Sequence, residues 1–138
     1  MSLLAVSDLH VHLGEAHVLK GIDFDVAEGG VTALLGRNGV GKTTTLRALL
    51  NGNRVLLVDE PTKGLAPLLV TEVARVLERV SELTTVLLVE QNLGVVQKLA
   101  RDAIVLDTGR VVHIGPAQEL LADRPMVHRM LGVGAVAA

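Results

Sequence analysis

The sequence of 138 residues contains no cysteine, no tryptophan, no tyrosine and a single phenylalanine, Phe24. Without cysteine, the chain has no disulfide bond, no thiolate metal ligand and no thiol nucleophile. Because aromatic residues are so scarce, a stacked nucleotide base has to rest on Phe24, a histidine or an arginine. These absences exclude disulfide-stabilised scaffolds and cysteine-dependent enzymes.

Long uncharged stretches and a strong excess of one charge are also missing. Charged residues such as Lys63, Glu72 and Arg75 interrupt every apolar stretch before it reaches the roughly 18 residues of a membrane-spanning helix. No basic segment precedes the short apolar patch at the N-terminus, as a secretory signal would require. Thirteen basic and fifteen acidic residues give a net charge of −2, without a basic block for nucleic acid. We therefore expect a soluble, intracellular protein that does not bind nucleic acid.

Hydrophobic residues make up 49% of the chain, which is enough for one core, so we expect residues 1–138 to form a single domain. Short continuous runs of Val and Leu are typical of strands that are buried on both faces. Such runs occur at Leu3–Val6, Val31–Leu35, Val55–Val58, Val86–Val89 and Ile104–Leu106. Helical segments lie between several of them, and this alternation predicts an α/β fold with a mostly parallel sheet.

Two helices are predicted from the spacing of apolar residues. A long one is expected over Leu68–Leu83, because apolar residues recur there at spacings of three and four. The predicted buried face consists of Leu69, Val73, Val76, Leu77 and Val80. A shorter helix is expected over Asn92–Ala100, with Asn92 as its N-cap.

The first thirty residues alternate more strongly, which predicts an antiparallel β layer beside the main sheet. We expect three strands there, separated by Gly14 and Gly21, at Ala5–Leu13, Val18–Lys20 and Ile22–Val26.

Thr108-Gly109 predicts a hairpin turn, and Pro116 and Pro125 are expected to open two terminal helices. The tail from Gly132 to Ala138 is small and apolar, and we expect it to fray.

Three histidines, His10, His12 and His17, lie in the N-terminal segment. Residues two apart in a strand share a face, so a metal site is conceivable there. No carboxylate pattern completes a ligand set, and we expect surface histidines instead.

Residues 36–43 match the pattern G-x-x-x-x-G-K-[ST] between a predicted buried strand and a predicted helix. Glycines in this loop let the backbone curl so that its N–H groups point at phosphate oxygens. Lys42 would reach the β and γ phosphates of a nucleoside triphosphate, and the Thr43 hydroxyl would ligate Mg²⁺. The predicted nucleotide site consists of Gly36, Arg37, Asn38, Gly39, Val40, Gly41, Lys42, Thr43 and Thr44.

Two carboxylates, Asp59 and Glu60, directly follow the predicted strand Val55–Val58. Ligands of open α/β sheets bind at this end of the strands. Asp59 would hold Mg²⁺, and Glu60 would polarise an attacking water. An acidic pair before Pro61 is also compatible with a plain turn, but beside a phosphate loop it predicts a magnesium and water site.

These segments resemble the ATP-binding subunits of ABC transporters, and more narrowly those of branched-chain amino acid importers. The resemblance rests on the sequences at 36–46, 56–67 and 87–92, the last being Leu-Leu-Val-Glu-Gln-Asn. It implies a P-loop NTPase fold that binds ATP and Mg²⁺ and, in full-length relatives, hydrolyses ATP to drive transport. It also implies a second ATP-binding subunit and membrane permease subunits as partners, at the inner face of the plasma membrane.

The resemblance further implies a role for Gln91, which stands at a switch position that is usually His. Gln91 would sense the γ-phosphate and act with Glu60 as a catalytic residue. Its strand, Val86–Val89, would lie between the phosphate-loop strand and the strand that ends at Asp59. The family stacks adenine on an aromatic residue near the N-terminus; Leu13 stands there, so base stacking is expected to be weak or absent.

Only the fourteen residues 45–58 separate Thr44 from Asp59, where the family inserts a long segment. The missing segment carries the glutamine loop, the helical lobe and the Leu-Ser-Gly-Gly signature. A helix over Lys42–Leu50 followed by a turn at 51–53 would still close the chain. We therefore expect ATP and Mg²⁺ binding with little hydrolysis and no transport coupling by this chain alone.

Two other functions stay open at this point. One is a non-catalytic nucleotide-binding remnant or regulatory module. The other is a small P-loop kinase, which is disfavoured because no loop with clustered arginines follows Glu60.

Overall fold

The computed structural model describes residues 2–36, 41–48 and 54–132. Within these ranges two strands form an antiparallel hairpin: β1 (Ser2–Leu13) and β2 (Ala16–Ala27). The main sheet consists of β3 (Val31–Leu35), β4 (Val55–Asp59), β5 (Thr85–Val89), β6 (Ala100–Asp107) and β7 (Arg110–Pro116). The helices are α1 (Lys42–Ala48), α2 (Pro67–Leu83), α3 (Leu93–Leu99), α4 (Ala117–Ala122) and α5 (Arg124–Leu131).

The main sheet has the strand order β4-β5-β3-β6-β7. Its first four strands are parallel, and β7 pairs antiparallel with β6. The predicted α/β fold with a mostly parallel sheet is confirmed, and β5 lies between β3 and β4 as expected. Because the carboxyl ends of parallel strands meet at one edge, the residues that follow β3, β4 and β5 are brought together.

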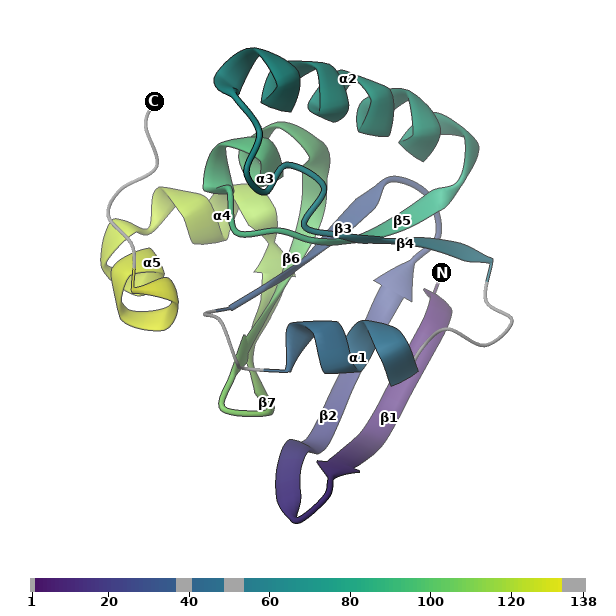
Figure 1. Cartoon of the computed structure of the whole chain (residues 1–138), viewed down its shortest axis with the longest axis vertical. Helices are drawn as coiled ribbons and strands as arrows, with labels where there is room; N and C mark the ends of the chain where they lie inside the picture. The colour runs from purple at the N-terminus through teal and green to yellow at the C-terminus, as the bar shows by residue number, and fades with distance from the viewer. Residues whose placement is uncertain (1, 37–40, 49–53, 133–138) are drawn as a thin grey trace.

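Apolar cores lie on the two faces of this sheet. Along β3, Val31, Ala33 and Leu35 face helices α2 to α5, whereas Leu34 faces the hairpin of β1 and β2. Helix α1 lies on the hairpin side and contacts β2 and β4 (Figure 1). The continuous aliphatic run of β3 is therefore required by burial on both faces.

Helix α2 begins at Pro67, one residue before the predicted start, and buries Ala74 and Leu77. The predicted buried face is partly wrong, because Leu69 and Val76 are exposed. The helix is apolar over a wider arc than the sheet covers, so periodicity alone could not fix its rotation. Among the described residues, no helix combines the length and apolar character needed to cross a membrane.

The N-terminal layer is simpler than the three expected strands, because β1 and β2 each run for 12 residues. Gly14 forms the predicted turn, but Gly21 lies inside β2. Leu9 pairs with Ile22 and His10 with Lys20, so Gly21 is the extra residue of a β-bulge. Its φ of +81° is a conformation that glycine adopts readily, and this accounts for its position.

The turn and the two helix starts that were predicted in the last third of the chain are confirmed. Thr108-Gly109 forms the β6–β7 turn, with positive φ at both residues. Pro116 precedes α4, Pro125 lies in the first turn of α5, and the Asn92 side chain caps α3 through the Val95 N–H. The predictions for Arg37, Asn38, Gly39, Val40, the turn at 51–53 and the tail beyond Gly132 fall outside the described residues.

Candidate functional site

The predicted site residues come from separate segments that meet at the carboxyl edge of the main sheet. Gly36 follows β3, Asp59 ends β4, Gln91 follows β5, and α1 begins at Lys42. In the strand register, Val89 lies opposite Asp59 on one side and Leu34 on the other. The fold thus brings together the two segments that the sequence assigned to phosphate, magnesium and water.

Lys42 is a buried cation at the centre of this edge, with 5% of its surface exposed. Its Nζ donates a 2.8 Å hydrogen bond to the carbonyl oxygen of Gly36 and lies 3.8 Å from Oε1 of Glu60. Burial lowers the pKa of Lys42 below its ordinary 10.5, while the carboxylates of Glu60, Asp59 and Glu90 act in the opposite direction. The loop therefore holds a positive charge that is shielded from water, where it would interact strongly with phosphate.

Gly41 connects the loop to α1 in a conformation that requires glycine. Its φ is +106°, and a Cβ built on it would lie 2.5 Å from Cδ2 of the fully buried Leu19. The Gly41 carbonyl accepts bonds from both the backbone N–H and the hydroxyl of Thr45, at 2.8 Å and 2.7 Å. Gly41 is therefore hydrogen-bonded to the first turn of α1, and it lies too close to Leu19 of β2 for a side chain to fit.

Thr43 and Asp59, the two predicted magnesium ligands, lie side by side. The Thr43 hydroxyl donates to Oδ2 of Asp59 over 3.5 Å, across 16 positions of sequence. Neighbouring oxygens of an octahedral Mg²⁺ shell lie about 3 Å apart, given metal–oxygen distances of about 2.1 Å. The hydroxyl and the carboxylate therefore fit a shared magnesium ion with a small side-chain adjustment.

Among the described residues, no group of three or more His, Asp or Glu side chains is arranged to hold a metal ion. Magnesium commonly relies on one or two carboxylates together with substrate phosphates and water. A magnesium ion at Thr43 and Asp59 would therefore need a bound nucleotide to complete its shell.

Glu60, the predicted water-polarising residue, faces the loop from the end of β4. Its backbone N–H donates to the Val89 carbonyl at 2.7 Å, and its φ of +45° is uncommon for a residue with a side chain. Its Oε1 accepts a 2.8 Å bond from Nε2 of Gln91, and its Oε2 lies 3.6 Å from Nζ of Lys63. The two residues predicted to be catalytic are thus in direct contact.

Glu90 and Thr62 are members of this group that sequence reasoning missed. Glu90 is buried, and its carboxylate accepts bonds from the Thr62 hydroxyl at 2.8 Å and from the Gln91 N–H at 2.9 Å. A usable signal existed: Glu90 directly follows the continuous aliphatic run Val86–Val89, as Asp59 follows the run Val55–Val58. Its partner Thr62, 28 positions away, had no comparable signal.

Two adjoining pockets open onto these side chains. A pocket of about 290 Å³ is lined by Val18, Gly41, Lys42, Thr43, Thr44, Glu60 and Lys63. A second, of about 300 Å³, is lined by Glu60, Thr62, Lys63, Glu90, Gln91 and Asn92. Glu60 and Lys63 line both, so they stand at the boundary between the Lys42 pocket and the Gln91 pocket.

Two of the residues considered for base stacking, Phe24 and Leu13, offer no aromatic face to a base. Phe24 is 4% exposed and packs in the core between the hairpin and the sheet. Leu13 is exposed beside the β1–β2 turn. The structure therefore offers no Phe24 face to a base, and Leu13 provides apolar contact only.

The three histidines gather on the hairpin. His12 and His17 stack with ring centroids 4.1 Å apart, and Nδ1 of His10 lies 3.0 Å from Nε2 of His17. The Nε2 of His10 lies 3.0 Å from Oδ1 of Asp8. Desolvation, followed by the charges of His12 and His10, lowers the pKa of His17 below its ordinary 6.5.

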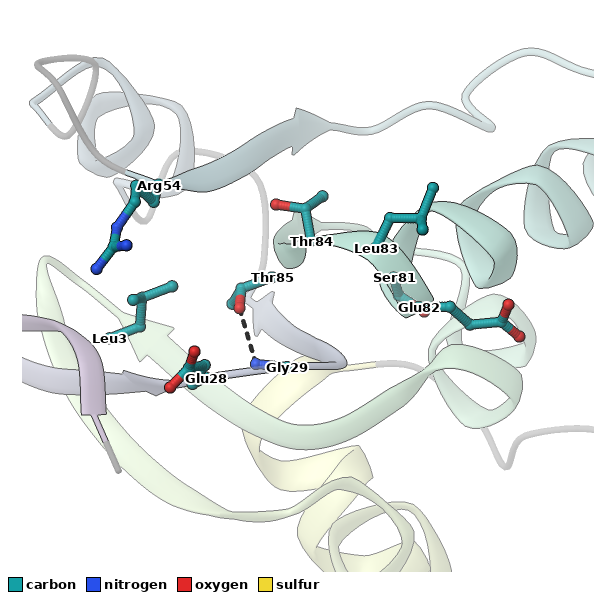
Figure 2. A pocket seen from close by; sticks show the side chains of 9 residues that line it. All are labelled: Leu3, Glu28, Gly29, Arg54, Ser81, Glu82, Leu83, Thr84 and Thr85. Atoms are coloured by element: carbon teal, nitrogen blue, oxygen red, sulfur yellow. Dashed lines mark hydrogen bonds between the residues drawn. The ribbon is translucent and has the colours of Figure 1, made fainter.

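A separate pocket of about 310 Å³ lies at the amino ends of the strands (Figure 2). There the Gly29 N–H donates to the Thr85 hydroxyl at 2.8 Å, which ties the start of β5 to the turn before β3. Glu28, Arg54 and Glu82 supply charge to its lining (Figure 2). Its lining includes none of the predicted site residues, which lie at the other edge of the sheet.

Comparison with known proteins links the loop segment to a family. Residues 19–53 match the ABC transporter family. The chain is 39% identical over 87 residues to the high-affinity branched-chain amino acid transport ATP-binding protein BraG of Pseudomonas aeruginosa, a match covering 62% of the chain and 37% of that protein. It is 52% identical over 46 residues to the phosphate import ATP-binding protein PstB 2 of Listeria monocytogenes, covering 33% of the chain and 17% of that protein. The chain thus spans well under half the length of these curated relatives.

Solved structures share the fold. The structure of cbiO1 from Clostridium perfringens, part of the ABC transporter complex cbiONQ, superposes with a TM-score of 0.77 at 19% sequence identity. The superposition covers 93% of each chain. The local sequence match and the shared fold confirm the predicted resemblance to ABC transporter ATP-binding domains. The relatives' names include two different solutes, so they agree on ATP-binding proteins of transport systems and not on one solute.

Proposed function

We propose that this chain, which has the fold and the phosphate-loop segment of ABC transporter ATP-binding domains, binds Mg-ATP at the carboxyl edge of its sheet. The observation that carries the proposal is the convergence of Lys42, Thr43 and Asp59, with two magnesium-type oxygens 3.5 Å apart. This convergence joins the phosphate-loop segment to an acidic strand end that lies 16 positions further along the chain. A plain glycine-rich turn would not require it.

Each side chain has a defined task in this proposal. Lys42 binds the β and γ phosphates, and the loop amides together with Thr44 line the remaining phosphate oxygens. Thr43 and Asp59 hold Mg²⁺, which when bound neutralises phosphate charge and orients the phosphate chain. Glu60 and Gln91 lie on the side of the pocket where the γ-phosphate and an attacking water would be.

Hydrolysis by this chain alone is proposed to be slow. Only residues 49–54 join α1 to β4, so the inserted segment that completes the site in relatives has no counterpart between these elements. The Glu60 carboxylate, whose Oε1 lies 3.8 Å from Nζ of Lys42, would orient an attacking water. In full-length relatives the same acidic pair would support hydrolysis that drives transport.

We infer that the chain's lineage is that of branched-chain amino acid importers, because the BraG match extends over 62% of the chain and the phosphate importer match over 33%. A second ATP-binding subunit and membrane permease subunits at the cytoplasmic face would be the partners of a complete subunit. The solute itself would be chosen by those other subunits.

A nucleotide-binding module without turnover is the second candidate, and the short connection at 49–54 favours it. It shares every binding residue with the first candidate and differs only in turnover. A steady-state phosphate-release assay separates the two. Turnover close to that of intact ABC ATPases would contradict the proposed slow hydrolysis.

The binding proposal is tested by titration calorimetry with ATP, with and without Mg²⁺. The wild-type chain should bind Mg-ATP, and Lys42→Ala should weaken binding by at least about a hundredfold, because a buried charged contact is lost. Lys63→Ala is the matched control: Lys63 lines the same pocket but its side chain is 75% exposed. Water screens such a charge, so the control should change affinity by no more than about threefold. Equal losses in the two variants would remove the support for a Lys42 phosphate site.

A further inference from the structure

Glu90 is a buried carboxylate to which the proposed function gives no task. It is 3% exposed at the end of β5. One carboxylate oxygen accepts from the Thr62 hydroxyl at 2.8 Å. The other accepts from two backbone amides, that of Gln91 at 2.9 Å and that of Asn92 at 3.1 Å. Burial of a carboxylate is costly unless its oxygens are bonded in this way, so the arrangement is strongly constrained.

The bonds of Glu90 close a ring between two neighbouring strand ends. Thr62 lies two residues after Glu60 in the segment that follows β4, and Glu90 and Gln91 follow β5. The Thr62 hydroxyl donates to Glu90 on one side of the ring, and the side-chain Nε2 of Gln91 donates to Glu60 on the other. The position of the Gln91 side chain therefore depends on an anchor at Glu90 as well as on its own contact with Glu60.

We propose that Glu90 is a positioning residue that, through Thr62 and the backbone of Gln91 and Asn92, sets the Gln91 side chain against Glu60 and toward the γ-phosphate position. This inference rests on the proposed function, because it assigns Gln91 the task of distinguishing a triphosphate from a diphosphate. Glu90 itself does not touch the nucleotide in this arrangement. Its effect on binding is transmitted through the segment that it anchors.

The geometry also fixes which chemical property of Glu90 matters. Two backbone N–H donors require an acceptor oxygen, and the Thr62 hydroxyl can either donate or accept. A glutamine at this position can accept from the amides with its oxygen and donate to Thr62 with its NH₂ group. A methionine of similar length can do neither. Glu90→Gln and Glu90→Met therefore separate the hydrogen-bonding role from simple filling of the space.

The first measurement is amide hydrogen exchange of the full chain, which needs no nucleotide. In Glu90→Met the amides of Gln91 and Asn92 should exchange at least about tenfold faster than in the wild type, because their acceptor is gone. In Glu90→Gln their protection should be retained. Unchanged protection in Glu90→Met would overturn the anchor. Thermal unfolding of each variant verifies that the comparison is made between folded chains.

The second measurement is the ratio of the Kd for Mg-ADP to the Kd for Mg-ATP. Glu90→Met should lower this ratio about fivefold by weakening Mg-ATP alone, as expected for the loss of one positioned hydrogen bond. Thr62→Val should act in the same direction and Thr62→Ser should restore the ratio. Thr71→Val is the control, since the Thr71 hydroxyl donates to the Pro67 carbonyl within α2, at 3.2 Å.

Equal weakening of ADP and ATP by Glu90→Met would overturn the positioning role, because it would indicate general damage to the site. A wild-type chain that binds neither nucleotide would overturn the proposed function and with it the γ-phosphate role of Gln91. The exchange measurement would then still decide whether Glu90 anchors Gln91. The two failures are thus distinguishable.

Discussion

The side-chain amide of Gln91 donates a 2.8 Å hydrogen bond to Oε1 of Glu60, although 31 positions separate the two residues. Each residue follows one of two neighbouring parallel strands, and the Glu60 N–H bonds the carbonyl of Val89 at 2.7 Å. The same Oε1 lies 3.8 Å from Nζ of Lys42. One carboxylate oxygen therefore faces both the proposed phosphate-binding cation and the proposed γ-phosphate sensor.

Glu60→Gln is expected to retain Mg-ATP binding and to abolish the residual hydrolysis. The carboxamide removes a negative charge beside the phosphates, so affinity should stay equal or rise by a few fold. It also removes the base that would polarise water. Calorimetry and phosphate release measure the two effects, with Glu78→Gln on the exposed side of α2 as the control. A tenfold loss of Mg-ATP affinity in Glu60→Gln would assign Glu60 to binding instead of catalysis.

Asp59→Asn is expected to reduce the dependence of ATP binding on magnesium. The ratio of the Kd values without and with Mg²⁺ should fall about tenfold, because the neutral amide is a poor magnesium ligand. Asp107→Asn is a matched control, since Asp107 also ends a parallel strand of the same sheet. An Asp59→Asn chain with the wild-type magnesium dependence would contradict the shared site at Thr43 and Asp59.

Strands β3 and β5 were predictable because burial on both faces leaves a simple signature. The same prediction is wrong for Val55–Val58, because β4 lies at one end of the described sheet and only Val55 is buried. The run Val31–Leu35 was predicted with the bounds that β3 has, and all five of its residues are buried. The order of β3, β5 and β4 followed from the family resemblance and is confirmed. Because β3, β5 and β4 are parallel neighbours, their carboxyl ends bring Asp59 and Glu60 to the same edge as the end of the phosphate loop. A local sequence pattern alone could not have predicted this.

The rotation of α2 and the bulge in β2 could not be obtained in the same way. Apolar residues of α2 extend beyond the face that the sheet covers, so Leu69 and Val76 fitted the periodicity and are nonetheless exposed. Gly21 carries the signal of a turn, but it serves as an extra residue inside a strand. Both errors have one cause: a local pattern does not specify which partner surface will pack against it.

The buried Glu90 could not be predicted from composition, because glutamate is among the residues least often buried. Its burial depends on Thr62, which comes close only after β4 and β5 have paired. Sequence reasoning therefore assigned residues to nucleotide binding and gave no role to Glu90.

Gly41→Ala is expected to destabilise the fold and to weaken ATP binding. A side chain at φ +106° is strained, and its Cβ would crowd Leu19 at 2.5 Å, so the combined cost should be about 2–4 kcal/mol of unfolding free energy. Gly64→Ala separates the two causes, because Gly64 also has a positive φ of +77° but nothing lies within 4 Å of its Cβ position. This control should cost about 1 kcal/mol. Equal costs in urea denaturation would contradict a specific packing role for Gly41.

The histidine stack on the hairpin is expected to make stability depend on pH. The folded-state pKa of His17 is lowered below 6.5, first by desolvation and then by His12, His10 and Lys20. The unfolded chain therefore binds more protons than the folded chain as the pH falls below 6.5. This contribution to stability is complete above that pH and is lost as the pH falls through the folded pKa.

The melting temperature should accordingly decrease between about pH 7.5 and about pH 5, the range in which histidine gains its charge. His17→Gln should reduce this decrease, because the ring that both neighbours would repel is absent. His128→Gln in α5, outside the stack, is the control and should leave the slope unchanged. If His17→Gln and His128→Gln gave the same pH profile as the wild type, the stacked rings would carry no part of the acid sensitivity.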